Sequence, residues 1–207
     1  SCVEAMKNSA GKTPVTVKSR IAVDDQNPDE VLPEFIAKVA NSGCNVFIIH
    51  ARKALLEGLS PKDNRRVPPL QYPLVYEMQK NFPELDIILN GGLTDLKEMK
   101  SCVKNRVAGV MIGREAYQNP SILLNVDNEI FDQKEKVRSM KDAIRNMIEY
   151  CNREKAEGTA IKGILKHLKG AFKGRANSKE FKRVLFCNET TDSEKLERLS
   201  NLVPIYC

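Results

Sequence analysis

The sequence predicts an α/β fold: the C-terminal half of a (β/α)8 (TIM) barrel, followed by an all-α helical domain. Three observations predict it. Residues 1–131 alternate short apolar runs with amphipathic segments, which is typical of parallel sheets. Each apolar run ends in a basic, imidazole, amide or glycine residue, as expected where barrel strands end at an active site. Residues 132–207 show only helical periodicity.

The elements of residues 1–131 follow from local patterns. Strands are short, β-branched and apolar, whereas helices show apolar residues three and four apart and begin at proline or at capping residues. Thr94 or Asp95 is expected to cap the last of these helices. We expect strands at PVTVKSRI (14–21), CNVFIIHA (44–51), DIILNGG (86–92) and GVMIGR (109–114), and helices at CVEAMK (2–7), 29–43, 73–83 and 94–105.

An open doubly wound sheet is the alternative to a barrel. That fold would place a G-x-G-x-x-G motif after its first strand, and the sequence lacks the motif. A complete barrel needs eight strands, and four strands leave two parallel edges open to aggregation. We therefore expect the N-terminal half of the barrel as a partner, in the same protein or in a separate chain.

Residues 132–207 carry the whole net charge of +6, because they hold 17 basic and 11 acidic residues while residues 1–131 are neutral. This asymmetry predicts two domains, 1–131 and 132–207, of which the second faces a polyanion such as RNA. Its helices are expected at 134–158, 159–174, 178–186 and 192–203. Within 159–174 one apolar face (Ile161, Leu165, Leu168, Phe172) adjoins a lysine stripe, Lys162, Lys166, Lys169 and Lys173.

The lysine stripe is a candidate RNA-binding surface. No acidic residue occurs from Thr159 to Ser178, so no neighbour one helical turn away neutralises it. The alternative is an ordinary solvated helix face. Because the chain has no tryptophan, we expect recognition of the shape and backbone of a folded RNA rather than base stacking.

Bulk composition excludes several classes of protein. With 42% hydrophobic residues among 207, the chain can bury a core. No apolar run approaches the roughly 20 residues that span a bilayer, and no secretory signal opens the chain, so no membrane partner is expected. Six scattered cysteines and two histidines predict no metal site and an intracellular, reducing compartment, the cytoplasm or an organelle matrix. Cys44 is expected to fill the core.

Two neighbouring strand ends carry glycine. Gly91 and Gly92 follow Asn90, and Gly113 precedes Arg114. Bare backbone N–H groups at such turns cradle anions, and a guanidinium can clamp a phosphate through two hydrogen bonds. In barrels a common phosphate site lies after the last two strands. The pattern predicts phosphate binding, and the alternative is that these glycines only permit tight turns.

Further candidates lie at the same predicted edge. Lys18 could stabilise negative charge on a bound ring and His50 could donate a hydrogen bond to it, or Lys18 could pair with Asp24 or Asp25 and His50 could be a core residue. The long loop from Arg52 to Pro73 has no periodicity of its own, which is typical of functional or disordered loops. Its basic residues could grip a nucleic-acid backbone or simply be solvated.

Longer motifs give a specific resemblance. The segments VTVKSRI, FIIHARKALLEGLSPKDNRRVPPLQYPLVYEMQKNFPELDIILNGGL, GVMIGREAYQNP and HLKGAFKG are similar to the tRNA-dihydrouridine synthases, in their A-type branch, from about residue 2 to 186. The resemblance implies an FMN enzyme on a (β/α)8 barrel with a helical tRNA-binding domain. NADPH reduces the flavin, a D-loop uridine of tRNA is reduced, and a cysteine supplies a proton.

Carried over by position, the resemblance implies a role for each candidate. Lys18 and His50 would contact the flavin. The phosphate would be held by Asn90, Gly91, Gly92, Gly113 and Arg114. The incoming uridine or tRNA would lie near Arg52, Lys53, Asn64 and Arg65.

The chain departs from the family in two places. Ala22 stands where the family usually has glycine, and none of the six cysteines lies in the family's N-x-G-C-P setting, so the proton-donating cysteine is expected upstream of Ser1 and no catalytic residue is assigned here. The leading hypothesis is the C-terminal part of an FMN-dependent tRNA-dihydrouridine synthase. The alternative is a truncated, non-catalytic relative that acts as an RNA-binding or structural subunit.

Overall fold

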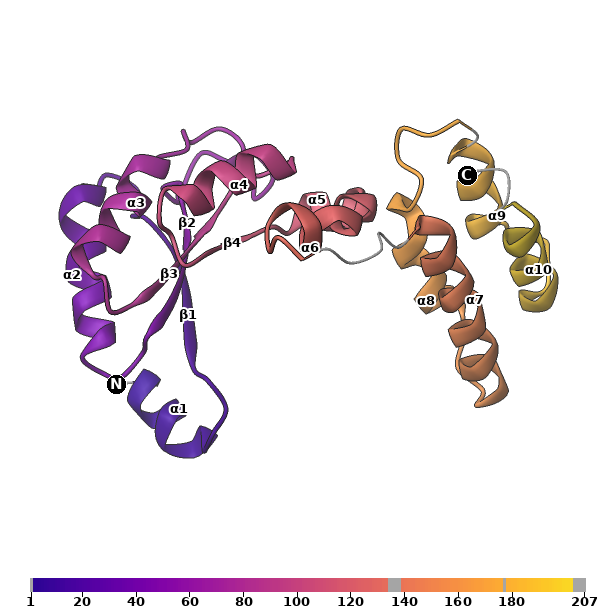
Figure 1. Ribbon diagram of the computed structural model, residues 1–207, viewed down its shortest axis with the longest axis horizontal. Coiled ribbons are helices and arrows are strands. Elements are labelled where there is room, and N and C mark those ends of the chain that lie inside the picture. Colours follow the sequence, from indigo (N-terminus) through magenta and orange to yellow (C-terminus); the bar gives the residue numbers. More distant parts are fainter. Residues whose placement is uncertain (1, 134–138, 177, 203–207) are drawn as a thin grey trace. The chain divides into compact units, whose positions relative to one another are not determined.

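The computed structural model describes residues 2–133, 139–176 and 178–202 (Figure 1). The chain forms two compact units, Ser1–Ile112 and Gly113–Cys207. The domain boundary expected between residues 131 and 132 rests on charge and periodicity, and it stays a prediction.

The first unit contains a parallel four-stranded sheet. Its strands β1 (Thr16–Arg20), β2 (Val46–His50), β3 (Asp86–Asn90) and β4 (Gly109–Met111) pair in the order β1-β2-β3-β4. The predicted parallel α/β class is confirmed. The order never reverses, so the sheet has no switch point of the kind at which open doubly wound sheets bind ligands. A consecutive order is consistent with an arc of a barrel.

One helix of the first unit precedes β1, and the others lie between successive strands along the chain (Figure 1). They are α1 (Cys2–Ala10), α2 (Pro28–Ala40), α3 (Tyr72–Asn81) and α4 (Leu96–Lys104), with a short 3-10 helix η1 (Asp63–Arg65) in the long loop. Asn27 caps α2 by accepting from the Asp29 N–H, and Pro28 supplies the dihedral angle that a first turn needs. Asp95 caps α4, as one of the two predicted caps.

The two faces of the sheet differ in burial. One face presents side chains that are fully buried under the helices, from β2 Phe47 and Ile49 and from β3 Ile87 and Leu89. The other face is only partly covered, since Ile48 is buried but Lys18 and Asp86 are exposed. Cys44 is completely buried, which confirms it as a core residue.

The second unit is helical throughout its described elements. They are α5 (Arg114–Gln118), η2 (Pro120–Asn125), α6 (Val126–Glu129), α7 (Met140–Ala156), α8 (Lys162–Leu165), η3 (Lys166–Gly170), α9 (Ser178–Phe186) and α10 (Asp192–Leu202). A buried cluster that includes Ile144, Leu165, Phe172 and Phe181 joins α7, α8, η3, α9 and α10. The predicted helical residues 134–138 and 203 lie outside the described residues.

Among the predicted elements that differ from the structure, two bear on the candidate sites. The fourth strand ends at Met111 rather than Arg114, and Gly113 instead precedes α5. The single helix expected over 159–174 is a short α-helix followed by the 3-10 helix η3. At Gly170 the backbone approaches another segment so closely that an added Cβ would lie 2.6 Å from the Gln118 carbonyl oxygen. The chain at this point adapts to its neighbour rather than to ideal α-helical geometry.

Within the ranges that the structure describes, no helix combines the length and apolarity that crossing a membrane requires.

Candidate functional site

The carboxyl ends of the strands meet in one row. The parallel register places Arg20 of β1 beside His50 of β2, His50 beside Asn90 of β3, and Asn90 beside Met111 of β4. Since side chains in register point to the same face of a sheet, the polar strand-end residues gather at one edge, as predicted. We call this row, together with Lys18, the rim.

Asn90 fixes Lys18 at the rim. The Lys18 ammonium donates to Asn90 Oδ1 at 2.8 Å, and Asn90 Nδ2 donates to the Met111 carbonyl at 2.7 Å. Partial burial lowers the pKa of Lys18, and the neighbouring positive charge of Arg20 lowers it further. Among the described residues, the Lys18 ammonium bonds Asn90 and forms no ion pair with Asp24 or Asp25, and Asp24 Oδ1 accepts from the Leu56 N–H at 2.7 Å.

The glycine turn after β3 adopts a backbone that other residues avoid. Gly91 has φ +113° and Gly92 has φ +72°. A Cβ on Gly91 would lie 3.1 Å from His50 Nε2, and one on Gly92 would lie 2.5 Å from Leu70 Cδ1. The turn therefore places bare backbone directly beside the His50 imidazole. These properties fit an anion cradle, since both positions require glycine and a cation and an imidazole stand at the same rim.

Arg20 organises the loop that follows β2. Its Nη1 donates to the carbonyl oxygens of Lys53 (2.7 Å) and Asn64 (2.8 Å) and to Asn64 Oδ1 (3.1 Å). Asn64 Oδ1 also accepts from the Leu55 N–H at 3.1 Å, and Asn64 Nδ2 donates to the Leu55 carbonyl. The Asn64 amide, predicted to lie near tRNA, is thus used to shape the loop.

The other predicted loop residues differ in exposure. Arg65 is exposed, whereas Arg52 and Lys53 are half-buried. Arg52 Nη1 donates to the Arg66 carbonyl at 3.2 Å and to the Pro68 carbonyl. Burial lowers the pKa of Arg20, followed by the positive charges of Arg52 and Arg65, so three guanidinium groups lie near one another. This concentration of positive charge favours an anionic ligand.

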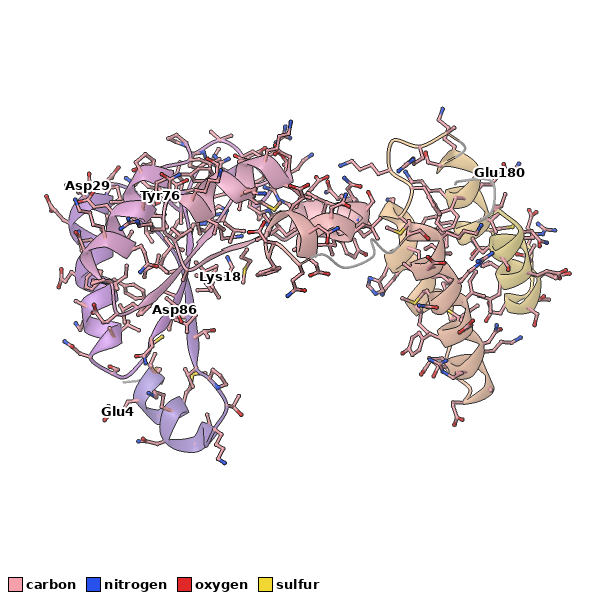
Figure 2. The ribbon with its side chains drawn as sticks, viewed as in Figure 1. Glu4, Lys18, Asp29, Tyr76, Asp86 and Glu180 are labelled. Atoms are coloured by element: carbon pink, nitrogen blue, oxygen red, sulfur yellow. The ribbon has the colours of Figure 1, made fainter. Side chains whose placement is uncertain are left out.

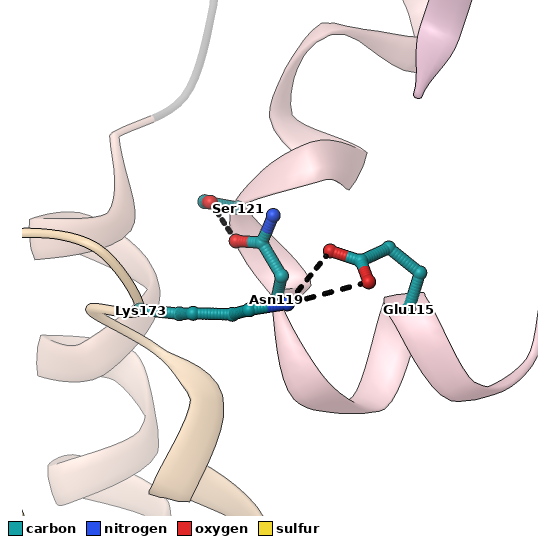
Figure 3. Close-up of polar contacts among 4 residues, drawn as sticks. All are labelled: Glu115, Asn119, Ser121 and Lys173. Carbon is teal, nitrogen blue, oxygen red and sulfur yellow. Dashed lines mark hydrogen bonds and ion pairs between the residues drawn. The ribbon is translucent and has the colours of Figure 1, made fainter. Parts of the chain in front are cut away.

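In the second unit the lysine stripe is exposed, as predicted. Lys162, Lys166, Lys169 and Lys173 are all exposed while the apolar face beneath them is buried or partly buried. The expectation of a stripe without acidic partners is wrong at Lys173, whose amino group lies 3.2 Å from Glu115 Oε1 (Figure 3). Glu115 belongs to α5, far away in sequence, so a search for partners one turn away could not find it.

Arg114 is exposed as the first residue of α5, directly after Gly113. Nothing lies within 4 Å of the position that a Cβ on Gly113 would occupy. In contrast to Gly91 and Gly92, Gly113 has space around it. No group of three His, Cys, Asp or Glu side chains that could hold a metal ion occurs in the part of the chain that the structure describes.

Comparison with known proteins identifies the family. The family model described as "Dihydrouridine synthase (Dus)" matches residues 1–204. The chain belongs to the dihydrouridine synthase family. The resemblance found in the sequence motifs is thereby confirmed.

Similar Dus proteins are described as tRNA-dihydrouridine(20/20a) synthases. This chain is 46% identical to the one from Escherichia coli (strain K12) over 185 residues, which cover 89% of this chain and 53% of that protein. It is 45% identical to the Vibrio cholerae protein (88% and 55% covered) and 43% identical to the Salmonella typhi protein (98% and 61% covered). The chain thus spans little more than half the length of the curated relatives it matches.

Among solved structures, a Salmonella typhimurium RcsB response regulator gives a TM-score of only 0.28 at 14% identity, with 91% of this chain and 98% of that chain covered. This likeness carries no argument about the Dus chain.

Sequence patterns missed several residues that shape the site of this Dus chain. Tyr72 and Arg20 each form a hydrogen bond to a segment distant in sequence, and Leu70 lies close to the turn of Gly91 and Gly92. Arg20 stood at a predicted strand end, which gave a partial signal. Tyr72 stood at the start of a helix, and nothing in the local pattern distinguished it from an ordinary surface tyrosine.

Proposed function

We propose that this chain is the C-terminal part of an FMN-dependent tRNA-dihydrouridine synthase, which reduces a D-loop uridine of tRNA with NADPH as the source of reducing equivalents. Family membership supports the reaction class. The observation that carries the proposal is the rim: a fixed ammonium group, an imidazole and a two-glycine turn lie together at the carboxyl ends of parallel strands. The names of the relatives make positions 20 and 20a the first to test.

The rim residues are suited to hold FMN. The Lys18 ammonium, positioned by Asn90, would stabilise negative charge on the ring, and His50 would donate a hydrogen bond. Gly91 and Gly92 would offer backbone N–H groups to the phosphate, and Gly113 and Arg114 are proposed as further phosphate contacts from the residue pattern. When bound, the flavin supplies hydride transfer. The proton that completes the reduction is assigned to no residue of this chain.

The tRNA would contact two basic surfaces. Arg52, Lys53 and Arg65 lie on the loop after β2, and Asn64 would act by holding that loop in shape. Lys162, Lys166 and Lys169 present exposed amino groups to the backbone of a folded RNA. Lys173 would contribute less, because Glu115 already lies beside its ammonium group.

The N-terminal half of the barrel is the proposed partner of the first unit, in the same protein or as a separate chain. Both edges of the sheet, β1 and β4, lack a neighbouring strand within the described residues. A cavity of about 270 Å³ lies between the end of β1 and α2. Ser19 Oγ, at its wall, is buried without a hydrogen-bond partner among the residues described, and Phe35 is 39% exposed. An apolar surface left open in this way favours a covering segment.

The test uses the natural protein that carries this sequence. Purified protein is expected to retain flavin through gel filtration and, with NADPH, to form dihydrouridine in unmodified tRNA. Arg114→Ala is expected to lose flavin during filtration. Protein that binds tRNA but neither holds flavin nor forms dihydrouridine would instead identify a non-catalytic RNA-binding subunit.

A further inference from the structure

Tyr72 ties the start of α3 to the glycine turn. Its hydroxyl donates to the Gly91 carbonyl oxygen at 2.6 Å, across 19 positions of sequence. The position that a Cβ on Gly92 would occupy lies 3.2 Å from Tyr72 Oη and 2.5 Å from Leu70 Cδ1. The turn therefore lies close to the side chains of Tyr72, Leu70 and His50.

Support of this kind matters because the turn consists of two glycines. Glycine populates positive and negative φ about equally, so an unsupported Gly91–Gly92 pair would sample many orientations. Ordering it costs conformational entropy whenever an anion binds. A hydrogen bond that exists before binding removes part of this cost, which is the basis of preorganised affinity.

The hydrogen bond also fixes a direction. The Gly91 carbonyl and the Gly92 N–H belong to the same peptide group, which is planar and trans, so the two groups point in opposite directions. When Tyr72 holds the carbonyl oxygen, the Gly92 N–H is directed away from Tyr72. One contact therefore sets the orientation of a donor on the opposite side of the turn.

The chemistry of Tyr72 suits a permanent donor. Burial raises the pKa of its hydroxyl, and the nearby Glu98 carboxylate raises it further. The group therefore stays protonated throughout the range in which proteins function. A deprotonated oxygen would repel both the Gly91 carbonyl and an anion bound at the turn.

We propose that Tyr72 is a positioning residue for the phosphate group of bound FMN: it orients the Gly92 N–H by holding the Gly91 carbonyl oxygen. The proposal rests on the proposed function, since the phosphate is that of the flavin nucleotide. It adds a residue outside the glycine turn that determines the preference for a phosphorylated flavin.

The test compares Tyr72→Phe with Tyr76→Phe. Tyr76 lies one turn later on α3 (Figure 2), and its hydroxyl donates to Cys102 Sγ at 3.4 Å instead of to the glycine turn. Each variant loses one partly buried hydroxyl and keeps its ring. Fluorescence titration of the flavin-free natural protein measures the affinities for FMN and for riboflavin, which lacks the phosphate.

We expect Tyr72→Phe to weaken FMN binding about fivefold, the effect typical of one net hydrogen bond, while riboflavin binding stays as in the wild type. Tyr76→Phe is expected to leave the ratio of the two affinities unchanged. NMR relaxation should also report greater mobility of the Gly91 and Gly92 amides in flavin-free Tyr72→Phe.

The outcomes separate the two proposals. An unchanged affinity ratio in Tyr72→Phe, with a wild type that prefers FMN, overturns the role of Tyr72 and leaves the proposed function standing. A wild type that binds no flavin overturns both. Loss of folding in Tyr72→Phe but not in Tyr76→Phe also overturns the positioning role, because the hydroxyl would then support the fold.

Discussion

Gly170 offers the sharpest test of the packing within the second unit. A Cβ at this position would lie 2.6 Å from the Gln118 carbonyl oxygen and 2.7 Å from that of Tyr117. Both contacts are with main chain, which cannot rotate away as a side chain can. Gly170→Ala therefore requires η3 and α5 to separate by roughly half an ångström or more, and such overpacking costs about 1–3 kcal/mol.

Part of this cost is offset in the unfolded state. Alanine restricts the unfolded chain and stabilises a protein by about 0.4–1 kcal/mol where its conformation is allowed. Gly170 has no positive φ, so this gain applies, and we expect a net destabilisation of about 1–2 kcal/mol. Contacts that hold α5 against residues 166–173, Lys173 with Glu115 and Tyr117 with His167 at 3.1 Å, would be strained by the same movement.

Gly163 provides the matched control. It lies in α8, and nothing is found within 4 Å of its added Cβ. Gly163→Ala is expected to stabilise the protein by about 0.5–1 kcal/mol, because glycine is a poor helix former. The two substitutions make the same chemical change with opposite expected signs.

Urea unfolding followed by circular dichroism measures both effects as shifts of the midpoint. Hydrogen exchange of the amides in α7 and α9 would assign the loss to the second unit. A Gly170→Ala protein as stable as the wild type would refute the close approach of η3 to α5. Equal destabilisation by Gly163→Ala would show that the effect of Gly170 is not steric.

Two further predictions concern charge. Alanine at Lys162, Lys166 or Lys169 is expected to reduce the magnitude of the negative slope of log affinity for tRNA against log salt by roughly 0.7–0.9 each. Lys173→Ala is expected to reduce it by less, because Glu115 already lies beside the Lys173 ammonium group. Equal slopes for all four variants would contradict this ion pair. The pKa of Tyr72 and that of Tyr76 are raised mainly by burial, so the unfolded chain loses these protons first and stability should fall as pH rises above about 10. Melting temperatures from about pH 9 to pH 11 should fall less steeply in Tyr72→Phe or Tyr76→Phe, and an unchanged slope would argue against burial of these hydroxyls.

Local patterns were sufficient to predict the sheet. Each strand is a short apolar run bounded by turn residues, and a parallel register necessarily brings the ends of successive strands to one edge. The sequence alone therefore predicts that Lys18, His50 and Asn90 lie together. The consecutive strand order agrees with the barrel half inferred from the polar strand ends.

Contacts between distant segments could not be predicted in this way. Lys173 pairs with the Glu115 carboxylate, 58 positions away in sequence, and Arg20 donates hydrogen bonds to Asn64, 44 positions away. The 3-10 helix η3 ends at Gly170, where the backbone passes close to the Gln118 carbonyl of α5, and helical periodicity cannot predict such an approach. Asn64 and Asn90 were expected as ligand contacts from the family resemblance; in the structure their amides form hydrogen bonds within the protein, and their contact with a ligand stays a prediction.

Asn90 illustrates how narrowly a single amide can be constrained. From β3 its Oδ1 accepts a hydrogen bond from Lys18 of β1 and its Nδ2 donates one to the Met111 carbonyl at the end of β4, so the two ends of the amide are not interchangeable. Aspartate would keep the lysine and repel the Met111 carbonyl, and leucine would release both. A substitution at position 90 would therefore disturb a connection among three strands, and replacing Lys18 would remove the part of that connection that reaches β1.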